Sequence, residues 1–300
     1  MTGPRAAAAA PSRGPRPQRL TLGRLGLYAF LLTAAAFFAV PLYVMIVTSL
    51  KSMPEIRQAQ IFALPAALDL SAWKTAWSGA CAGGTCEGIS TGFWASVRIT
   101  IPSVAISVML GAINGYALSF WRPRGGNLMF GLLMAGALVP YQVFLYPLVR
   151  GMAAAGLYNS WPGIVLVHVL FGLPLVTLLF RAYFVAIPEE LFKASRLDGA
   201  GFWRIFFEIM LPMSVPMIVV ASMMQFTGIW NDFLLGLVFA GRDNQPMMVQ
   251  LNNIVNTTTG ERLYNVNMAA TILTALVPLT IYFVSGRWFV RGIAAGAVKG

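Results

Sequence analysis

The sequence predicts an all-α integral membrane protein with six transmembrane helices and with both termini on the cytoplasmic side. Of its 300 residues, 58% are hydrophobic and only 10% are charged, whereas about 25% of the residues in a soluble domain are charged. Six apolar runs are each long enough to cross a hydrocarbon core of about 30 Å as a helix. Most Lys and Arg residues lie in the two terminal segments and in every second connection between these runs, which is typical of a multi-pass protein.

The predicted spans should be helices, because a helix satisfies its own backbone hydrogen bonds in lipid. They are too long and too uniformly apolar for barrel strands. The six spans are Leu25–Leu50, Phe93–Trp121, Asn127–Leu148, Trp161–Phe184, Ser214–Phe239 and Met268–Phe289. Prolines inside them, such as Pro41 and Pro140, are tolerated in membrane helices.

The N-terminal residues differ in composition from the rest of the chain. Residues 1–24 are rich in Ala, Pro and Arg and are expected to form a disordered cytoplasmic tail. The apolar run that follows is too long for the h-region of a signal peptide, so we expect it to be a retained span. Residues 25–300 are expected to form one six-helix transmembrane domain.

The net charge of +11 is explained by topology. Basic residues gather in the tail, in the second connection (Arg122 and Arg124), in the fourth connection and at the C-terminal end. The positive-inside rule makes these segments cytoplasmic and predicts a multi-pass protein of the inner (plasma) membrane. No basic face carries interleaved aromatic residues, so no nucleic-acid partner is expected.

The reactive side chains are few. Cys81, Cys86 and His168 do not provide the spacing of a metal site, and a GxxxxGK(S/T) phosphate loop is absent from the sequence. We therefore expect no catalytic residue, no metal and no cofactor bound by this chain. If the topology holds, Cys81 and Cys86 lie in an oxidising compartment, where they could form a structural disulfide; the alternative is two unpaired thiols.

The fourth connection, residues 187–216, is much longer than the two to eight residues that join most neighbouring helices. Pro188 and Glu189 favour a helix start, and Gly199 favours its end. A second, amphipathic segment should follow, with Trp203, Phe206, Phe207 and Met210 on its apolar side, ending at Leu211-Pro212.

This connection also carries small side chains at Ala194, Ser195, Gly199 and Ala200. Small side chains let the surface of another protein approach the backbone closely, so we interpret the segment as a docking site. The alternative is a loop that only connects two spans, but its length argues against this.

The segment resembles the cytoplasmic EAA loop of binding-protein-dependent ABC importers, in which a short coupling helix docks on an ATPase. Leu197-Asp198-Gly199-Ala200 and Leu211-Pro212 match that pattern within a coupling loop of about residues 187–212. Lys193-Ala194-Ser195 stands where Glu-Ala-Ala is usual. Because Lys193 replaces the acid, shape and small side chains should carry the docking more than that one charge.

The resemblance covers nearly the whole chain after residue 24. Within the importers, the chain is most similar to permeases of the carbohydrate (maltose-transporter-like) group. Three further motifs carry it: Thr48-Ser49-Leu50-Lys51, Trp230-Asn231-Asp232-Phe233 and Gly296-Ala297-Val298-Lys299-Gly300. A narrower likeness to glucose/mannose-type permeases comes from the Cys81–Cys86 loop, Pro140-Tyr141-Gln142-Val143-Phe144 and the polar stretch 252–260.

The resemblance implies a non-enzymatic permease subunit that forms half of the pathway of an ATP-driven sugar importer. Its implied partners are a second homologous permease, two ATPase subunits that use the ATP, an external sugar-binding protein and membrane lipid. The alternatives are a membrane enzyme, which needs clustered acid and base groups, and an ion-gradient-driven secondary transporter, which usually needs a titratable group near the midplane.

Polar side chains inside apolar spans are costly and therefore candidates for function. Gln225, Trp230, Asn231 and Asp232 are the candidate substrate-pathway residues, because amides exchange hydrogen bonds with hydroxyls and aromatic rings pack on sugars. Asp232 should lie near the outer end of the fifth span. For His168 and Asn114 a helix–helix hydrogen bond is the expected role.

Overall fold

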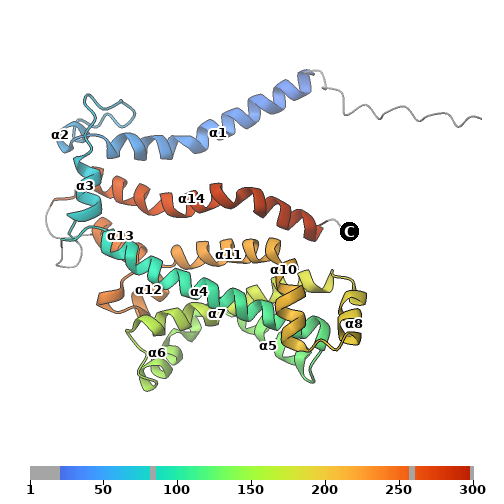
Figure 1. The fold of residues 1–300 in the computed structure, drawn as a ribbon. Coiled ribbons are helices and arrows are strands. Elements are labelled where there is room, and N and C mark those ends of the chain that lie inside the picture. The colour runs from blue at the N-terminus through green and yellow to red at the C-terminus, as the bar shows by residue number, and fades with distance from the viewer. Residues whose placement is uncertain (1–20, 82–85, 257–260, 298–300) are drawn as a thin grey trace, which may run out of the picture. The chain divides into compact units, whose positions relative to one another are not determined.

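The computed structural model describes residues 21–81, 86–256 and 261–297, with side chains as far as residue 286. Within these ranges every regular element is a helix (Figure 1), which confirms the predicted all-α class. The chain divides into two units, Met1–Met45 and Ile46–Gly300, and each is described by itself.

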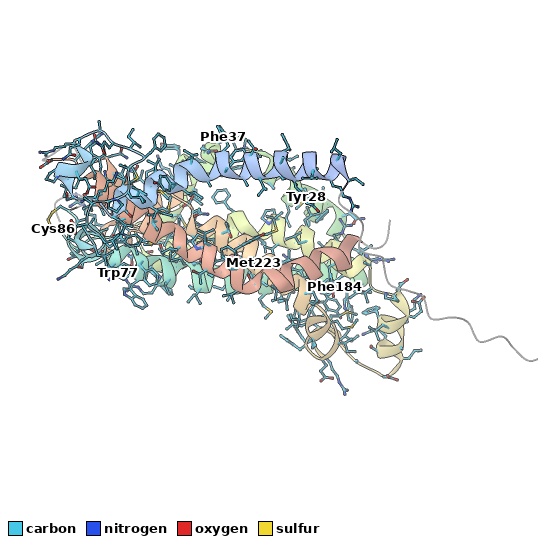
Figure 2. The ribbon with its side chains drawn as sticks, turned by 90° about the horizontal axis from the view of Figure 1, so that it is seen from above. Tyr28, Phe37, Trp77, Cys86, Phe184 and Met223 are labelled. Atoms are coloured by element: carbon cyan, nitrogen blue, oxygen red, sulfur yellow. A yellow bond between two sulfur atoms is a disulfide. The ribbon has the colours of Figure 1, made fainter. Side chains whose placement is uncertain are left out.

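The first unit contains most of helix α1 (Leu22–Ser49). The helix begins at Leu22, so the end of the predicted tail is helical, while residues 1–20 lie outside the described part of the chain. Phe30 and Phe37 expose 69% and 72% of their surfaces, and Figure 2 shows Phe37 and Tyr28 standing out from the ribbon. Apolar side chains on this surface suit a helix whose solvent is lipid.

At the centre of the second unit, α4 (Ser90–Tyr116) packs against α7 (Trp161–Val185). Two glycines on α4 allow this close approach. A Cβ built on Gly111 would overlap Val176, and one on Gly115 would lie 2.7 Å from the Arg181 backbone nitrogen. Small residues at such contacts are typical of membrane helices, where association depends on close packing.

A second helix pair packs beside the first. Helix α11 (Val215–Trp230) lies along α14 (Tyr264–Ala297). Trp230 is 1% exposed between them; its indole N–H donates to the Thr274 carbonyl at 3.3 Å, and its ring stacks on Phe226 at 5.5 Å. This packing fixes the end of α11 against α14.

The predicted third span is not one helix. Helix α5 (Gly126–Leu138) ends before Pro140, and the chain continues through η2 (Tyr141–Phe144) into α6 (Leu145–Ala154) at an angle of 99°. The expectation of a continuous helix over Asn127–Leu148 is therefore wrong. Pro140 lacks a backbone N–H and disfavours a helical conformation of the residue before it, so it occupies the break.

The predicted fifth span is also broken. Helix α11 ends at Trp230, and α12 (Leu234–Phe239) starts after a three-residue interruption at residues 231–233. Among the described helices, four are long and apolar enough to cross a membrane, or up to six if each of two bent pairs counts as one span. These bent pairs are Gly126–Leu138 with Tyr141–Ala154 and Phe202–Met213 with Val215–Trp230, so the count of six spans stays a prediction.

The remaining helices lie at the two ends of the second unit. Figure 1 places α3 (Ser71–Ser78) and α13 (Met247–Val255) at one end and α8 (Glu189–Leu197) at the other. The second unit also contains the short helices α2 (Met53–Ile56) and η4 (Arg242–Asn244).

The end that carries α3 is held together by polar contacts. Lys51 is 3% exposed; its ammonium donates to the Gln60 carbonyl at 2.8 Å, and its own carbonyl accepts from the Asn265 amide at 3.0 Å. Arg57 pairs with Glu261. A disulfide joins Cys81 to Cys86.

Candidate functional site

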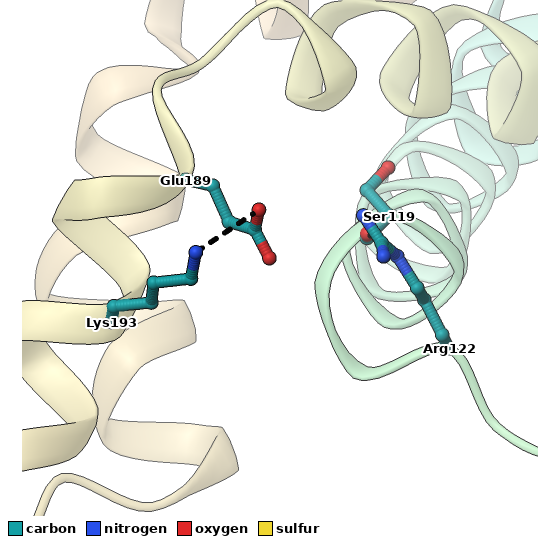
Figure 3. Close-up of polar contacts among 4 residues, drawn as sticks. All are labelled: Ser119, Arg122, Glu189 and Lys193. Carbon is teal, nitrogen blue, oxygen red and sulfur yellow. Dashed lines mark hydrogen bonds and ion pairs between the residues drawn. The ribbon is translucent and has the colours of Figure 1, made fainter.

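Helix α8 is the first helix of the fourth connection, residues 187–216. Pro188 precedes it in an extended conformation (ψ 129°), and Glu189 and Glu190 occupy its first turn, where the helix dipole favours acids. Lys193 Nζ lies 3.4 Å from Glu189 Oε2 (Figure 3). Both side chains are more than half exposed, so this pair contributes little to stability.

Gly199 ends α8 with a left-handed turn. Its φ is +78°, its N–H donates to the Arg196 carbonyl, and the Ala200 N–H donates to the Ser195 carbonyl, both at 3.1 Å. These two bonds form a Schellman motif. The predicted helix stop at Gly199 is therefore present, and no atom lies within 4 Å of a Cβ built there.

The second segment runs through α9 (Phe202–Ile205), the π-helical turn η3 (Phe206–Met210) and α10 (Leu211–Met213). It then bends by 78° at Ser214 into α11. The predicted end at Leu211-Pro212 therefore lies within α10. Leu211 is half-buried and Pro212 is exposed.

The predicted apolar side of this segment is only partly correct. Phe206 and Met210 are fully buried, but Trp203 and Phe207 are 56% and 50% exposed and stack on each other at 5.9 Å. Trp203 and Phe207 therefore share an exposed face of the segment, while Phe206 and Met210 share the buried one.

The exposed surface of α8 differs from the predicted small-residue patch. Lys193, Ala194, Asp198 and Gly199 are exposed, and Leu197 is 89% exposed. Ser195 and Ala200 are each 7% exposed, and the Ser195 hydroxyl donates to the Leu191 carbonyl at 2.8 Å. These two small residues therefore let α8 pack on the bundle, while the others form an outward surface.

Aromatic side chains at the end of α4 pack against the buried face of α8. Phe192 stacks on Phe120 at 5.0 Å and meets Trp121 edge-on at 5.7 Å. The Arg196 guanidinium lies 4.6 Å from the centre of the Trp121 ring, a distance at which cation–π attraction acts. Phe120 and Trp121 belong to the π-helical turn η1 (Ala117–Trp121) that continues α4.

A hydrogen-bonded pair extends this platform to the second segment. The Trp121 indole N–H donates to the Tyr116 hydroxyl at 2.6 Å, and that hydroxyl donates to the Phe202 carbonyl at 3.3 Å. Tyr116 is fully buried. The platform, defined as Tyr116, Phe120 and Trp121, was not predicted; the adjacent aromatic residues at the end of the second span were its only signal.

A separate cavity of about 540 Å³ lies where α11 breaks. It is bordered by α7, by the end of α11 and by the start of α12. Its polar lining residues are Tyr141, His168, Gln225, Asn231 and Asp232. Its size falls within the range of about 300–1,000 Å³ that is usual for small-molecule sites.

Gln225 has an unusual position in this cavity. It is 7% exposed, and its amide nitrogen has no hydrogen-bond partner among the described residues. A buried donor left unpaired costs about 1–3 kcal/mol. The side chain fits only because its neighbour on α7 is Gly172, where a Cβ would overlap the amide.

Asp232 was expected to lie along a continuous helix. It lies instead in the interruption between α11 and α12. Its carboxylate accepts from the Gly236 N–H at 2.9 Å and from the Leu235 N–H at 3.4 Å. It therefore caps the start of α12, which leaves fewer of its lone pairs free for a ligand.

The described structure places Trp230 away from this cavity, so its role in the substrate pathway stays a prediction, and it lacks the helix–helix hydrogen bonds expected for His168 and Asn114. Trp230 points toward α14 and is absent from the lining of the cavity, because its ring fills the core described above. His168 makes no hydrogen bond to a described residue and lines the cavity instead. Asn114 likewise makes no helix–helix side-chain hydrogen bond within the part of the chain that is described.

The fold and these sites define a membrane component of a transporter. Residues 94–295 match the family of binding-protein-dependent transport system inner membrane components, and this chain belongs to that family. It is accordingly a multi-pass inner-membrane protein, as predicted.

Curated relatives have related roles. A probable ABC transporter permease protein of Pyrococcus horikoshii is 38% identical over 60% of this chain and 65% of its own length. The alpha-glucoside transport system permease protein AglG of Rhizobium meliloti is 35% identical over 71% of this chain and 57% of its own length. The xylose/arabinose import permease protein XacI of Haloferax volcanii is 30% identical over 93% of this chain and 94% of its own length.

Among solved structures, a chain of a bacterial ABC transporter that imports the acidic polysaccharide alginate has the same fold. The TM-score is 0.75 at 20% identity, over 91% of this chain and 99% of that one.

Proposed function

We propose that this chain is one membrane-spanning half of an ATP-driven sugar importer. In this proposal α8 and the Gly199 turn receive force from a separate ATPase subunit, and the cavity beside Gln225 forms part of the sugar pathway. A second homologous permease, two ATPases and an external sugar-binding protein complete the transporter.

The coupling proposal rests on how α8 is held in place and on which of its side chains are exposed. Its backbone is closed by the Gly199 turn, one face rests on the aromatic platform, and the other face presents Leu197 at 89% exposure. An exposed apolar side chain on a rigid helix is a suitable anchor for a partner's pocket. Because α8 rests on the end of α4 through Phe192, movement of α8 should be transmitted to that span.

The chemistry of the cavity supports an uncharged, hydroxyl-rich substrate. Gln225 and Asn231 line the cavity with neutral amide side chains, which can exchange hydrogen bonds with hydroxyls. The charge of Asp232 is engaged by the α12 backbone. Several relatives are named for neutral sugars, and the glucose/mannose-type resemblance leads us to propose glucose or mannose as the substrate.

The experiment that tests this function is sugar uptake into proteoliposomes that contain the chain with its partner permease and ATPases. External binding protein and labelled glucose or mannose are added, with ATP inside the vesicles in one arm and a proton or sodium gradient in the other. We expect uptake only with ATP. Uptake that follows the gradient and ignores ATP would contradict the proposal and favour a secondary transporter.

A further inference from the structure

Two arginines line a cavity that has no part in the proposed transport cycle. The cavity has a volume of about 380 Å³ and lies between the end of α4, the start of α5 and the end of α7. Arg122 and Arg181 line it with Ser119, and Figure 3 shows Ser119 and Arg122 together at the end of α4. Among its lining residues, all of them described, none is acidic.

Neither arginine is neutralised by a carboxylate of the described chain. The Arg122 Nε donates to the Ser119 carbonyl at 3.2 Å, and the Arg181 guanidinium lies 4.1 Å from the centre of the Phe130 ring. Glu189 points toward this end of α4 (Figure 3), but it is paired with Lys193. Two guanidinium groups without a counter-charge favour an anion with several oxygen acceptors, such as a phosphate.

The backbone at the start of α5 also favours an anion in this cavity. Helix α5 starts at the cavity, and Gly125 precedes it with φ +78° and offers no side chain to cap the first turn. The first N–H groups of this 13-residue helix therefore carry the positive end of its dipole toward the cavity.

An apolar groove continues from the same place. It has a volume of about 1,200 Å³, shares Gly125 with the basic cavity and runs along α5 and α7 past Leu128, Leu132 and Leu175. Leu128 and Leu132 are 69% and 65% exposed. A basic cavity that opens onto an apolar groove matches a ligand with an anionic head and a hydrocarbon tail.

We propose that this composite site binds one anionic phospholipid of the cytoplasmic leaflet. Its phosphate lies between Arg122 and Arg181, and an acyl chain lies in the groove beside Leu132. Basic pockets between membrane helices on the cytoplasmic side are suited to such headgroups. The proposal rests on the orientation given above, which makes this end of α4 cytoplasmic. A free phosphate would explain the cavity alone, and a second permease would explain the groove alone.

The test measures lipid binding to the delipidated, fully assembled transporter by native mass spectrometry. Phosphatidylglycerol and phosphatidylcholine are added in turn, and inorganic phosphate is added as a competitor. We expect phosphatidylglycerol to bind more tightly and to be displaced poorly by phosphate. Equal binding of the two lipids, or ready displacement by phosphate, would overturn the proposal. No binding to the assembled transporter would do the same and would indicate that a partner subunit covers the groove.

Substitutions separate this site from general surface charge. Arg122→Gln and Arg181→Gln should each weaken phosphatidylglycerol binding about tenfold, as expected for loss of a charge-assisted contact. Arg124→Gln is the matched control, because Arg124 is an exposed neighbour that does not line the cavity. Equal losses in all three variants would overturn the proposal. Size-exclusion chromatography checks assembly, and Arg122→Gln, at an exposed position, remains informative if Arg181→Gln does not assemble.

A third substitution tests the groove. Leu132→Trp should fill the groove and weaken lipid binding while both arginines remain in place. Unchanged binding by this variant would overturn the placement of the acyl chain. Because these measurements use neither ATP nor sugar, their failure is distinguishable from a failure of transport.

Discussion

Gly172 of α7 and Gln225 of α11 fit together so closely that a Cβ on the glycine would overlap the amide nitrogen of the glutamine. The glycine thereby holds an otherwise unpaired polar group at the edge of the cavity. This relationship leads to the first two predictions.

Gly172→Ala should displace the Gln225 amide and raise the KM for sugar uptake about two- to tenfold, which corresponds to the loss of one ordinary hydrogen bond. Gly131→Ala on α5 is the matched control, since nothing lies within 4 Å of a Cβ built there. The comparison is made by initial rates of ATP-driven uptake. Equal KM values for the two variants would contradict a substrate role for this pair.

Gln225→Leu should lower transport without lowering stability. Leucine retains much of the side-chain volume and removes a buried donor that has no described partner, so the thermal unfolding midpoint should stay unchanged or rise. A parallel loss of uptake and of thermal stability would instead indicate that the amide is structural.

The conformation of Gly199 predicts which substitutions preserve the turn. Asparagine tolerates a positive φ, whereas valine does not, and a residue forced into that region costs about 1–3 kcal/mol. Gly199→Asn should therefore retain ATPase association, and Gly199→Val should weaken it. Both are measured by co-purification of the ATPase. Identical behaviour of the two variants would exclude the left-handed turn as the reason for glycine.

Reduction of the Cys81–Cys86 disulfide should destabilise the end of the molecule that carries α3 but leave the α8 surface unaffected. Closing so short a loop contributes about 2 kcal/mol in the chain-entropy view. Cys86→Ser with Cys81→Ser should therefore lower the thermal unfolding midpoint. ATPase association serves as the internal control, and a loss of association would contradict the separation of the two ends.

The sequence predicted α8 and its end well, because Pro188 and Gly199 are strong local signals for a helix start and stop. The breaks at Pro140 and at residues 231–233 were missed, because the long apolar runs on both sides of each break were interpreted as one continuous span despite the polar residues Gln142, Asn231 and Asp232. Residue type alone did not reveal that Trp230 faces α14 while Gln225 faces the cavity. The facing of a helix in an apolar environment depends on close packing, such as that between Gly172 and Gln225, which a single sequence does not record.

The platform beneath α8 was missed for a related reason. Phe120 and Trp121 lie at the end of one span and Phe192 lies in a distant connection, so nothing local links them. The spacing of Trp203, Phe206, Phe207 and Met210 likewise predicted one shared apolar face, whereas tertiary packing buries only Phe206 and Met210.

The most direct test of the account is the affinity of the assembled permease pair for its ATPase when Leu197 is changed. Leu197→Glu should weaken association about tenfold or more, because docking would bury an unpaired carboxylate. Leu68→Glu is the matched control: Leu68 is 76% exposed in the connection between α2 and α3. We predict loss of association for Leu197→Glu alone; unchanged association would show that α8 is not the contact through which ATP hydrolysis drives transport.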